Sequence, residues 1–354
     1  MQSRPARFEL CESYSISRVI KGGWQLAGGH GRIDERQALD DMAEFVMAGV
    51  TTFDCADIYT GVESLIGKFL RRHRAAMAAG DMPRVQVHTK YVPDLDTLAT
   101  VSLDDTRRII DRSLVRLGVE RLDLVQFMWW DYSVPRYVEV AMHLAELQKA
   151  GKIRHIGVTN FDVPQLEELL GAGCAIISNQ VQYSVLDQRP ARAMCEFARQ
   201  HGMSLLCYGA IAGGFLADKY LGATQRDYTE NRSLVKYRLI IEEMGGFDAF
   251  QRLLRVLKPI ADKNGVGIAE VAACYVLQQP SVAGVIVGAR HAGHLAGLRK
   301  LATLSLDEQD MATVQDVVDA QAGVPGGVYE LERDRGGRHG RIMRYNLNAA
   351  VERQ

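Results

Sequence analysis

The stretch "RVQVHTKYVPDLDTLATVSLDDTRRIIDRSLVRLGVERLDLVQFM" (residues 84–128) contains the pattern that decides the fold of this chain. Apolar segments at its two ends are typical of buried strands, and between them Ile109, Ile110, Leu114 and Leu117 recur at helical spacing. Gly118 follows at once, in the position where a left-handed residue ends many helices. We interpret the stretch as one strand–helix–strand unit.

The same alternation repeats in both directions, from "SRVIKGG" (17–23) to "VAGVIVGAR" (282–290), and makes eight strand–helix units. Eight such units in one chain predict an α/β fold with a closed parallel barrel, the (β/α)8 or TIM barrel, rather than a doubly wound sheet. No GxGxxG follows the first strand, which also disfavours a dinucleotide-binding sheet. We expect one barrel domain over residues 1–354, with its core at about 15–321.

Two segments fall outside this count. Residues 212–246 form a long connection after the seventh strand, and residues 322–354 form an arm rich in glycine and arginine after the last helix. Long connections in compact domains are usually functional, and the sites of this fold lie at the carboxyl ends of its strands. Both segments are therefore expected to reach over that end of the barrel.

The composition excludes several classes of function. The 354 residues are 47% hydrophobic and 24% charged with a formal net charge of -1, so nothing favours a nucleic-acid partner. The basic stretch "ERDRGGRHGRIMR" (332–344) is interpreted as a solvated or packed tail. No apolar run approaches the ~20 residues of a membrane span, and the N-terminus lacks a signal-peptide core.

The cysteines and histidines give no metal-binding pattern. The six cysteines are scattered without a CxxC pair, and the nine histidines lack ligand spacing. Reduced thiols are typical of the cytoplasm. We expect a cytoplasmic protein without a metal or membrane partner, either a monomer or a weak homo-oligomer.

Three polar side chains stand at the ends of neighbouring predicted strands. Asp54 and Tyr59 follow the second strand, and Lys90 ends the third. An ammonium near a phenol lowers the tyrosine pKa from about 10, and a carboxylate would hold that ammonium in place and charged. The set predicts an acid catalyst; the alternative is a surface tyrosine beside an ion pair that closes a barrel layer.

Six motifs resemble the signatures of the aldo-keto reductase family, in that family's order across the whole barrel. They are "FDCADIY" (53–59), "TK" (89–90), "GKIRHIGVTNF" (151–161), "NQVQYSVLD" (179–187), "YGAIAGGFL" (208–216) and "VIVGAR" (285–290). The resemblance implies a barrel that reduces a ketone or aldehyde with NADPH as hydride donor. It further implies Tyr59 as general acid, Lys90 tuning it and Asp54 orienting Lys90.

The resemblance also implies a cofactor site. Thr159, Asn160 and Gln180 would hold the nicotinamide carboxamide, because an amide needs both donors and acceptors. Tyr208 would stack on the nicotinamide ring; the alternative is an aromatic side chain that fills the barrel mouth. The expected cofactor contacts are Gly23, Trp24, Asp54, Thr159, Asn160, Gln180, Tyr208, Gly209, Ala210, Leu216, Lys219, Val287, Gly288, Arg290 and His294.

At the adenosine end of the cofactor, Lys219 and Arg290 are the candidates for the ribose phosphate, Lys as a point charge and Arg as a bidentate fork. The alternative for each is a solvated surface cation. Gly297 and Leu298 depart from the family, which often reads Glu-Asn there, so the adenine amino group loses partners. Selectivity would then rest on the phosphate rather than the base.

Met128 is a second departure, because the family has a histidine there that donates a hydrogen bond to the substrate carbonyl. A thioether never donates, and losing one such donor typically costs about 10²–10³ in rate. Met128 is alternatively an adaptable apolar surface under the substrate. An indole N–H of Trp24, Trp129 or Trp130 is a candidate replacement. The expected substrate contacts are Trp24, Tyr59, Met128 and Trp129.

Three functions compete. The first is a detoxifying carbonyl reductase, similar through Met128 and its "WWDY" mouth to bacterial reductases of 3-keto-deoxynivalenol, a bulky mycotoxin ketone; simple aldehydes, pyridoxal and sugar-derived ketones stay open. The second is an NADPH-binding, redox-sensing regulatory subunit with little turnover, similar to potassium-channel β subunits. The third is an unrelated barrel enzyme such as an aldolase. The intact set of Asp54, Tyr59 and Lys90 favours the first.

Overall fold

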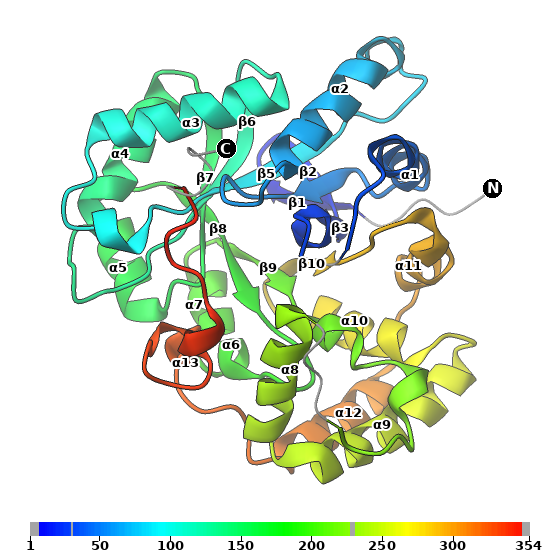
Figure 1. Cartoon of the computed structure of the whole chain (residues 1–354). Helices are drawn as coiled ribbons and strands as arrows, with labels where there is room; N and C mark the ends of the chain where they lie inside the picture. Colours follow the sequence, from blue (N-terminus) through cyan, green and yellow to red (C-terminus); the bar gives the residue numbers. More distant parts are fainter. Residues whose placement is uncertain (1–6, 30, 227–230, 349–354) are drawn as a thin grey trace.

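The computed structural model describes residues 7–29, 31–226 and 231–348, and confirms the predicted barrel (Figure 1). Eight parallel strands close on themselves in the order β10-β3-β4-β5-β6-β7-β8-β9. These strands are β3 (Val19–Gly22), β4 (Thr52–Asp54), β5 (Gln86–Tyr91), β6 (Leu122–Phe127), β7 (Ile153–Thr159), β8 (Ile176–Gln182), β9 (Ser204–Tyr208) and β10 (Val282–Val287).

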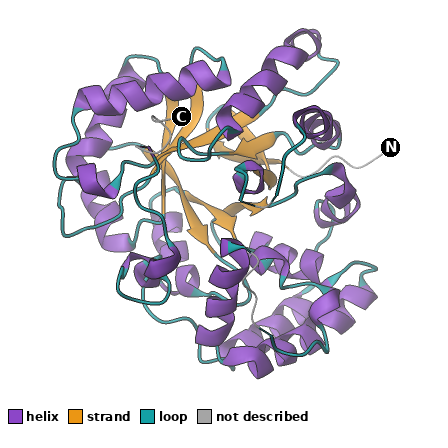
Figure 2. Cartoon of the chain, in the orientation of Figure 1, coloured by secondary structure: helices purple, strands orange, loops and turns teal. Residues whose placement is uncertain are grey.

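Helices surround the strands on all sides (Figure 2). Their bounds are α1 (Glu35–Met47), α2 (Val62–Ala79), α3 (Leu103–Leu117), α4 (Tyr137–Lys149), α5 (Val163–Gly171), α6 (Arg189–Arg192), α7 (Met194–Gln200), α8 (Arg232–Glu243), α9 (Gly246–Lys263), α10 (Ile268–Leu277), α11 (Leu295–Leu301), α12 (Glu308–Asp319) and α13 (Glu330–Arg333). Within the described part of the chain, none of them is both long and apolar enough to cross a membrane.

Helix α3 shows how the sequence sets the bounds of these elements. Ser102 and Asp105 form a reciprocal capping box, in which each side chain accepts from the other's backbone N–H. The helix ends at Gly118, whose φ of 67° is the left-handed conformation expected of a glycine cap. Ile110 and Leu117 are both 1% exposed, so the predicted apolar face is the face that packs on the barrel.

A hairpin of β1 (Arg7–Cys11) and β2 (Tyr14–Ser17) precedes the barrel and was not predicted. Its side chains Leu10 and Ile16 join Leu124 and Leu206 in a small apolar cluster separate from the main core. The hairpin therefore packs against the barrel strands through its apolar side chains.

The connection at 212–246 is more ordered than the prediction of a loop implied, because it contains helix α8. The buried residues Leu239, Ile240 and Ile241 are consecutive, so the apolar pattern lacks the clean helical period that would have revealed it. Side chains of α8 meet the C-terminal arm: Glu242 pairs with Arg338, and Glu243 lies 3.3 Å from His339. Figure 1 shows this arm in red beside α8.

Candidate active site

One pocket of about 610 Å³ opens at the carboxyl ends of the barrel strands. Every strand of the barrel supplies a residue to it, at its last position or close by, as expected for a parallel barrel. These residues are Gly22, Asp54, Lys90, Met128, Thr159, Gln180, Tyr208 and Val287. The connection after β9 and the C-terminal arm also line it, so both reach over the mouth as predicted.

The structure brings Asp54, Tyr59 and Lys90 together in this pocket. Lys90 Nζ donates to both carboxylate oxygens of Asp54, at 2.7 and 2.9 Å, and both side chains are nearly fully buried. The ammonium lies 5.2 Å from the centre of the Tyr59 ring. Gln180 Nε2 and Gln126 Nε2 also donate to Asp54 Oδ1, at 2.6 and 3.0 Å, so three side chains hold the carboxylate.

The prediction that Lys90 lowers the pKa of Tyr59 below its ordinary value is wrong in this structure. Burial raises the pKa of Tyr59 above its ordinary value, and the Lys90 ammonium opposes this with a smaller effect. Burial alone would lower the pKa of Lys90, but Asp54 and Tyr59 together raise it. At neutral pH this pair is therefore a neutral phenol beside a charged ammonium, which is the protonation state of a proton donor.

Met128 lies immediately after β6 and is 2% exposed. Its sulfur accepts a hydrogen bond from Asn160 Nδ2 at 3.7 Å, and Asn160 Oδ1 accepts from the Tyr208 hydroxyl at 2.9 Å. Asn160 has a φ of 60°, a left-handed conformation that asparagine tolerates better than most residues. The thioether thus helps to orient an amide while its apolar surface faces the pocket.

The structure contradicts the placement of Trp129 in the substrate pocket. Its side chain is fully buried, packs on Phe127, and donates its indole N–H to the carbonyls of Asp131 and Val134 at 3.0 Å. The next residue, Trp130, lines the pocket instead. Consecutive residues after a strand point to different sides, so the sequence alone does not say which tryptophan faces the ligand.

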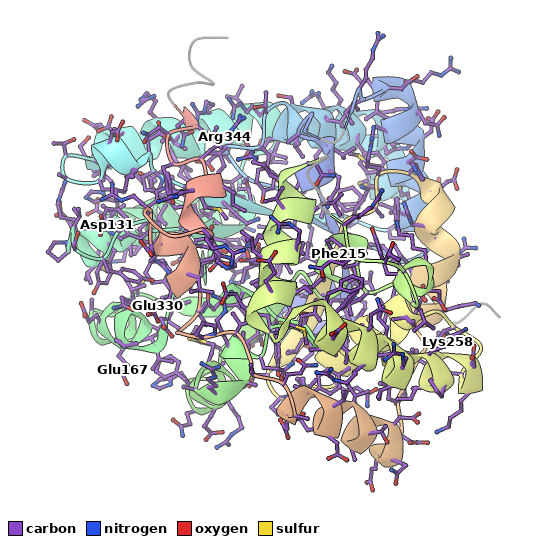
Figure 3. All side chains as sticks on the ribbon, turned by 60° about the horizontal axis from the view of Figure 1, so that its bottom comes forward. Asp131, Glu167, Phe215, Lys258, Glu330 and Arg344 are labelled. Atoms are coloured by element: carbon purple, nitrogen blue, oxygen red, sulfur yellow. The ribbon has the colours of Figure 1, made fainter. Side chains whose placement is uncertain are left out.

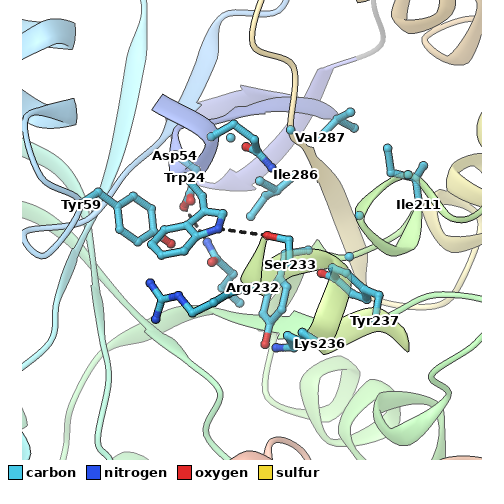
Figure 4. A pocket seen from close by; sticks show the side chains of 18 of the residues that line it. Trp24, Asp54, Tyr59, Ile211, Arg232, Ser233, Lys236, Tyr237, Ile286 and Val287 are labelled. Atoms are coloured by element: carbon cyan, nitrogen blue, oxygen red, sulfur yellow. Dashed lines mark hydrogen bonds between the residues drawn. The ribbon is translucent and has the colours of Figure 1, made fainter. Parts of the chain in front are cut away.

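The indole N–H groups of the three candidate tryptophans have different surroundings. Trp24 donates to Ser233 Oγ at 3.2 Å, as Figure 4 shows, and its ring centre lies 5.0 Å from that of Tyr59. Trp129 is engaged as described above. The Trp130 N–H has no acceptor among the described residues, but this atom is buried beside Tyr345 rather than open to the pocket.

Most of the expected cofactor residues line the same pocket. They are Trp24, Asp54, Thr159, Asn160, Gln180, Tyr208, Gly209, Lys219, Val287, Gly288 and His294. Ala210 and Leu216 do not line it, because both side chains are buried in the apolar core. Gly23 packs against the wall of the site, since a Cβ there would lie 2.8 Å from the Asp54 carbonyl oxygen.

Arg290 was predicted to bind the ribose phosphate of the cofactor, but it does not line the pocket. Its guanidinium turns toward the segment before α1 and donates to the Arg32 carbonyl at 2.9 Å. Gly297 and Leu298 do line the pocket, together with Glu270 of α10. A Cβ at position 297 would collide with the Glu270 carboxylate, so this glutamate takes the space that the missing side chain leaves.

The lining groups fit a nicotinamide dinucleotide. Two amides and an aromatic face are present in Asn160, Gln180 and Tyr208, and Lys219 supplies a cation. Gly213 and Gly214 also line the pocket, at φ values of 62° and 98° that favour glycine and let backbone amides approach a phosphate. The described residues contain no cluster of side chains suited to a metal ion.

Sequence reasoning missed a set of pocket residues on α8 and the arm, which we call the outer wall. They are Asn231, Arg232, Ser233, Lys236, Tyr237, Tyr329, Ile342, Met343, Arg344 and Leu347. The expected reach of segments 212–246 and 322–354 over the mouth signalled this wall without identifying its residues. The basic stretch 332–344 was interpreted as a solvated or packed tail, and its Ile342, Met343 and Arg344 line the pocket. Figure 3 shows the arm, with Arg344 labelled, running alongside α8.

Buried ion pairs hold the outer wall in place. Glu332 of the arm is 0% exposed and accepts from Arg189 at 3.0 Å. Arg189 also pairs with Asp187 at 2.7 Å, and Lys236 of α8 lies 3.5 Å from Glu332. Arg333 donates to the Asn160 carbonyl at 2.8 Å, which connects the arm to the end of β7.

Known proteins share both the sequence pattern and the barrel architecture of this chain. The sequence model described as "Aldo/keto reductase family" matches residues 18–319. Aldo-keto reductase YhdN of Bacillus subtilis is 24% identical over 323 residues, which cover 88% of this chain and 92% of that protein. A glycerol dehydrogenase from Gluconobacter oxydans superimposes with a TM-score of 0.73 at 24% identity, over 92% of this chain and 98% of its own. An aldo/keto reductase from Klebsiella pneumoniae, solved with NADP and acetate, gives 0.66 at 19%, over 89% and 95%.

Proposed function

The chain belongs to the aldo/keto reductase family, and from this premise we propose that it reduces a ketone or aldehyde to the alcohol with NADPH, with Tyr59 as the general acid. The observation that carries the proposal is the buried Lys90–Asp54 pair beside Tyr59 in a pocket lined by every barrel strand. A relative with bound NADP supports the choice of cofactor.

Bound NADPH supplies the hydride. Tyr59 holds a proton at its hydroxyl, because its raised pKa keeps the phenol neutral at physiological pH, and donates it to the oxygen of the reduced carbonyl. Lys90 stabilises the phenolate that remains, and Asp54 keeps the ammonium charged and in place. Asn160 and Gln180 would hold the carboxamide, while Tyr208, fixed by its bond to Asn160, would offer its ring to the nicotinamide.

Residues other than the predicted arginine would hold the adenosine end of the cofactor. Lys219 is the lining cation available for the ribose phosphate, since Arg290 faces away. Glu270 would accept from the adenine amino group in place of the side chain that Gly297 lacks. We therefore expect the base to keep one partner, supplied by α10 rather than by the segment after β10.

Met128 and Trp130 would form an adaptable apolar surface for the carbonyl compound, which supports a bulky substrate such as 3-keto-deoxynivalenol. The Trp130 N–H is the indole that remains unengaged, but its burial keeps it from the ligand in this conformation. Tyr59 would then be the principal donor to the developing alkoxide. A lower rate than that of a two-donor site is expected.

A screen of NADPH oxidation across aldehydes and ketones tests the proposal, with NADPH binding measured in parallel by fluorescence. We expect tight binding and carbonyl-dependent oxidation, faster with NADPH than with NADH. Tight binding without turnover of any carbonyl would contradict the reductase and point to a redox-sensing regulatory subunit.

A further inference from the structure

The charged side chains around the pocket are mostly basic. The basic residues are Lys90, Lys219, Arg232, Lys236 and Arg344, and the acidic residues are Asp54 and Glu270. Lys90 is neutralised by Asp54, and Lys236 is close to Glu332. Glu270 already accepts the Gly267 N–H at the start of α10. Positive charge therefore remains on the outer wall that no nearby carboxylate balances.

Arg232 and Arg344 carry that charge. Neither guanidinium has an ion-pair or hydrogen-bond partner among the residues that the structure describes. Arg232, the first residue of α8, is only partly exposed and lies 5.3 Å from the Trp24 ring centre. Figure 4 shows it extending past Trp24 on the side where Tyr59 lies.

The two arginines are also close enough to affect each other. Burial, and then the positive charge of Arg344, lower the pKa of Arg232. They approach from separate segments, α8 and the arm, which the ion pairs of Glu332 hold together. Holding two like charges near each other without a counter-ion is unfavourable, and an anion between them removes that repulsion.

We propose that Arg232 and Arg344 form an oxyanion subsite, and that the substrate is a carbonyl compound that bears a carboxylate or a phosphate. The inference rests on the proposed reductase function and narrows its substrate class to anionic carbonyl compounds; an uncharged ketone such as 3-keto-deoxynivalenol would then be the poorer substrate. Guanidinium groups bind both oxyanions through paired, charge-assisted hydrogen bonds. With the anion on the outer wall, the remainder of the molecule extends past Trp24 to place its carbonyl at Tyr59.

Matched pairs of carbonyl compounds test the subsite. 4-Carboxybenzaldehyde is compared with its methyl ester, and glycolaldehyde phosphate with glycolaldehyde, so that the two arms separate a carboxylate from a phosphate. Arg232→Gln and Arg344→Gln should each lower kcat/KM about 10- to 100-fold for the preferred anionic compound, chiefly through KM. Both variants should leave the neutral compounds nearly unchanged.

Arg341→Gln is the control, because it removes an exposed arm cation that lies outside the pocket lining. It should leave every rate unchanged. Equal rates for anionic and neutral compounds in the wild type, unaltered by either pocket variant, would overturn the subsite while the reductase stands. A weaker affinity for NADPH in both variants, with unchanged preference among carbonyls, would assign the arginines to the cofactor and also overturn it.

A binding measurement keeps the subsite testable if no carbonyl is reduced. Calorimetry with 4-(hydroxymethyl)benzoate and with 2-hydroxyethyl phosphate, in the presence of NADP⁺, reports anion binding without turnover. Binding of either anion that is lost in both arginine variants supports the subsite even if the reductase proposal fails. Absence of binding to the wild type, or equal binding to the variants, rejects it.

Discussion

The barrel mouth contains one buried ion pair and a second buried ion pair holds the outer wall in place, yet only the first lines the pocket. Lys90 and Asp54 join adjacent strands and line the pocket. Arg189 and Glu332 are separated by 143 residues, equally buried, and absent from the lining. Burial of an ion pair therefore does not by itself identify a catalytic site. A reactive partner such as Tyr59, at the edge of an open pocket, does.

Replacing Tyr59 by Phe gives the largest expected effect at the mouth. The variant keeps the ring and the Lys90–Asp54 pair but removes the proton, so kcat should fall by about 10²–10⁴ while NADPH binding is retained. Steady-state rates and fluorescence titration measure the two quantities. Tyr275→Phe is the control, because it removes a buried hydroxyl that bonds Gln315 away from the pocket. Undiminished turnover of Tyr59→Phe would mean that Tyr59 is not the proton donor. The Lys90–Asp54 pair would then be a structural ion pair, like that of Arg189 and Glu332.

Glu332→Gln tests the outer wall, where we expect a loss of stability rather than of chemistry. The substitution leaves Arg189 and Lys236 without their shared carboxylate in a buried site, which typically costs about 3–5 kcal/mol of unfolding free energy. Glu196→Gln breaks an exposed pair with Arg199, which solvent screens, and should leave the unfolding free energy nearly unchanged. Urea unfolding measures both. Similar losses in the two variants would show that the buried network is not what holds the arm.

Met128→His adds a donor to the mouth without altering the outer wall. If the missing donor limits the rate, reduction of small aldehydes should rise by up to about 10²-fold, since one donor to a developing alkoxide is typically worth that much. The new side chain also removes the acceptor of the Asn160 amide, so NADPH affinity is measured alongside kcat. A fall in rate for every carbonyl tested would identify Met128 as a substrate surface instead.

Asp57 lies between the two regions, and its titration makes the stability of the fold depend on pH. Burial, and then the Glu63 carboxylate, raise its pKa to about 7, against hydrogen bonds from Val92 and from Asn348 of the arm. The folded state therefore holds this proton more tightly than the unfolded chain does. The contribution to stability is fully present below about pH 4 and is lost as the pH rises through about 7.

Asp57→Asn should abolish this loss, which amounts to at most about 1.4 kcal/mol per pH unit. Urea unfolding of the wild type and the variant between about pH 4 and 8 provides the measurement. Parallel stability profiles for the two proteins would mean that Asp57 titrates normally and that its site is wetter than the structure shows.

The sequence predicts the mouth better than the wall for a physical reason. Strand ends in a parallel barrel converge, so Asp54 and Lys90 can be placed together from their position in the repeat, and the family resemblance adds Gln180. The outer wall follows no repeat. Arg232 and Arg344 line the same pocket because buried contacts of the arm, which join residues far apart in the sequence, hold the arm against α8.

The errors within the predicted site have equally local causes. Trp129 and Trp130 are consecutive, and the backbone after β6 decides which of them faces the pocket. Arg290 belongs to a matching motif, but its side chain finds a carbonyl outside the pocket. The pKa of Tyr59 depends on how far burial outweighs the ammonium, a balance that spacing in the sequence does not contain.

The pH dependence of carbonyl reduction tests the central claim, a neutral Tyr59 that donates its proton beside a charged Lys90, most directly. Single-turnover rates of NADPH oxidation should stay level from pH 6 to about 10 and decline only above it, as the phenol ionises. Ultraviolet difference spectra between the wild type and Tyr59→Phe should show ionisation in that same alkaline range. A decline in rate that begins near neutral pH, matched by phenolate absorbance there, would show that Tyr59 is already ionised and is not the general acid.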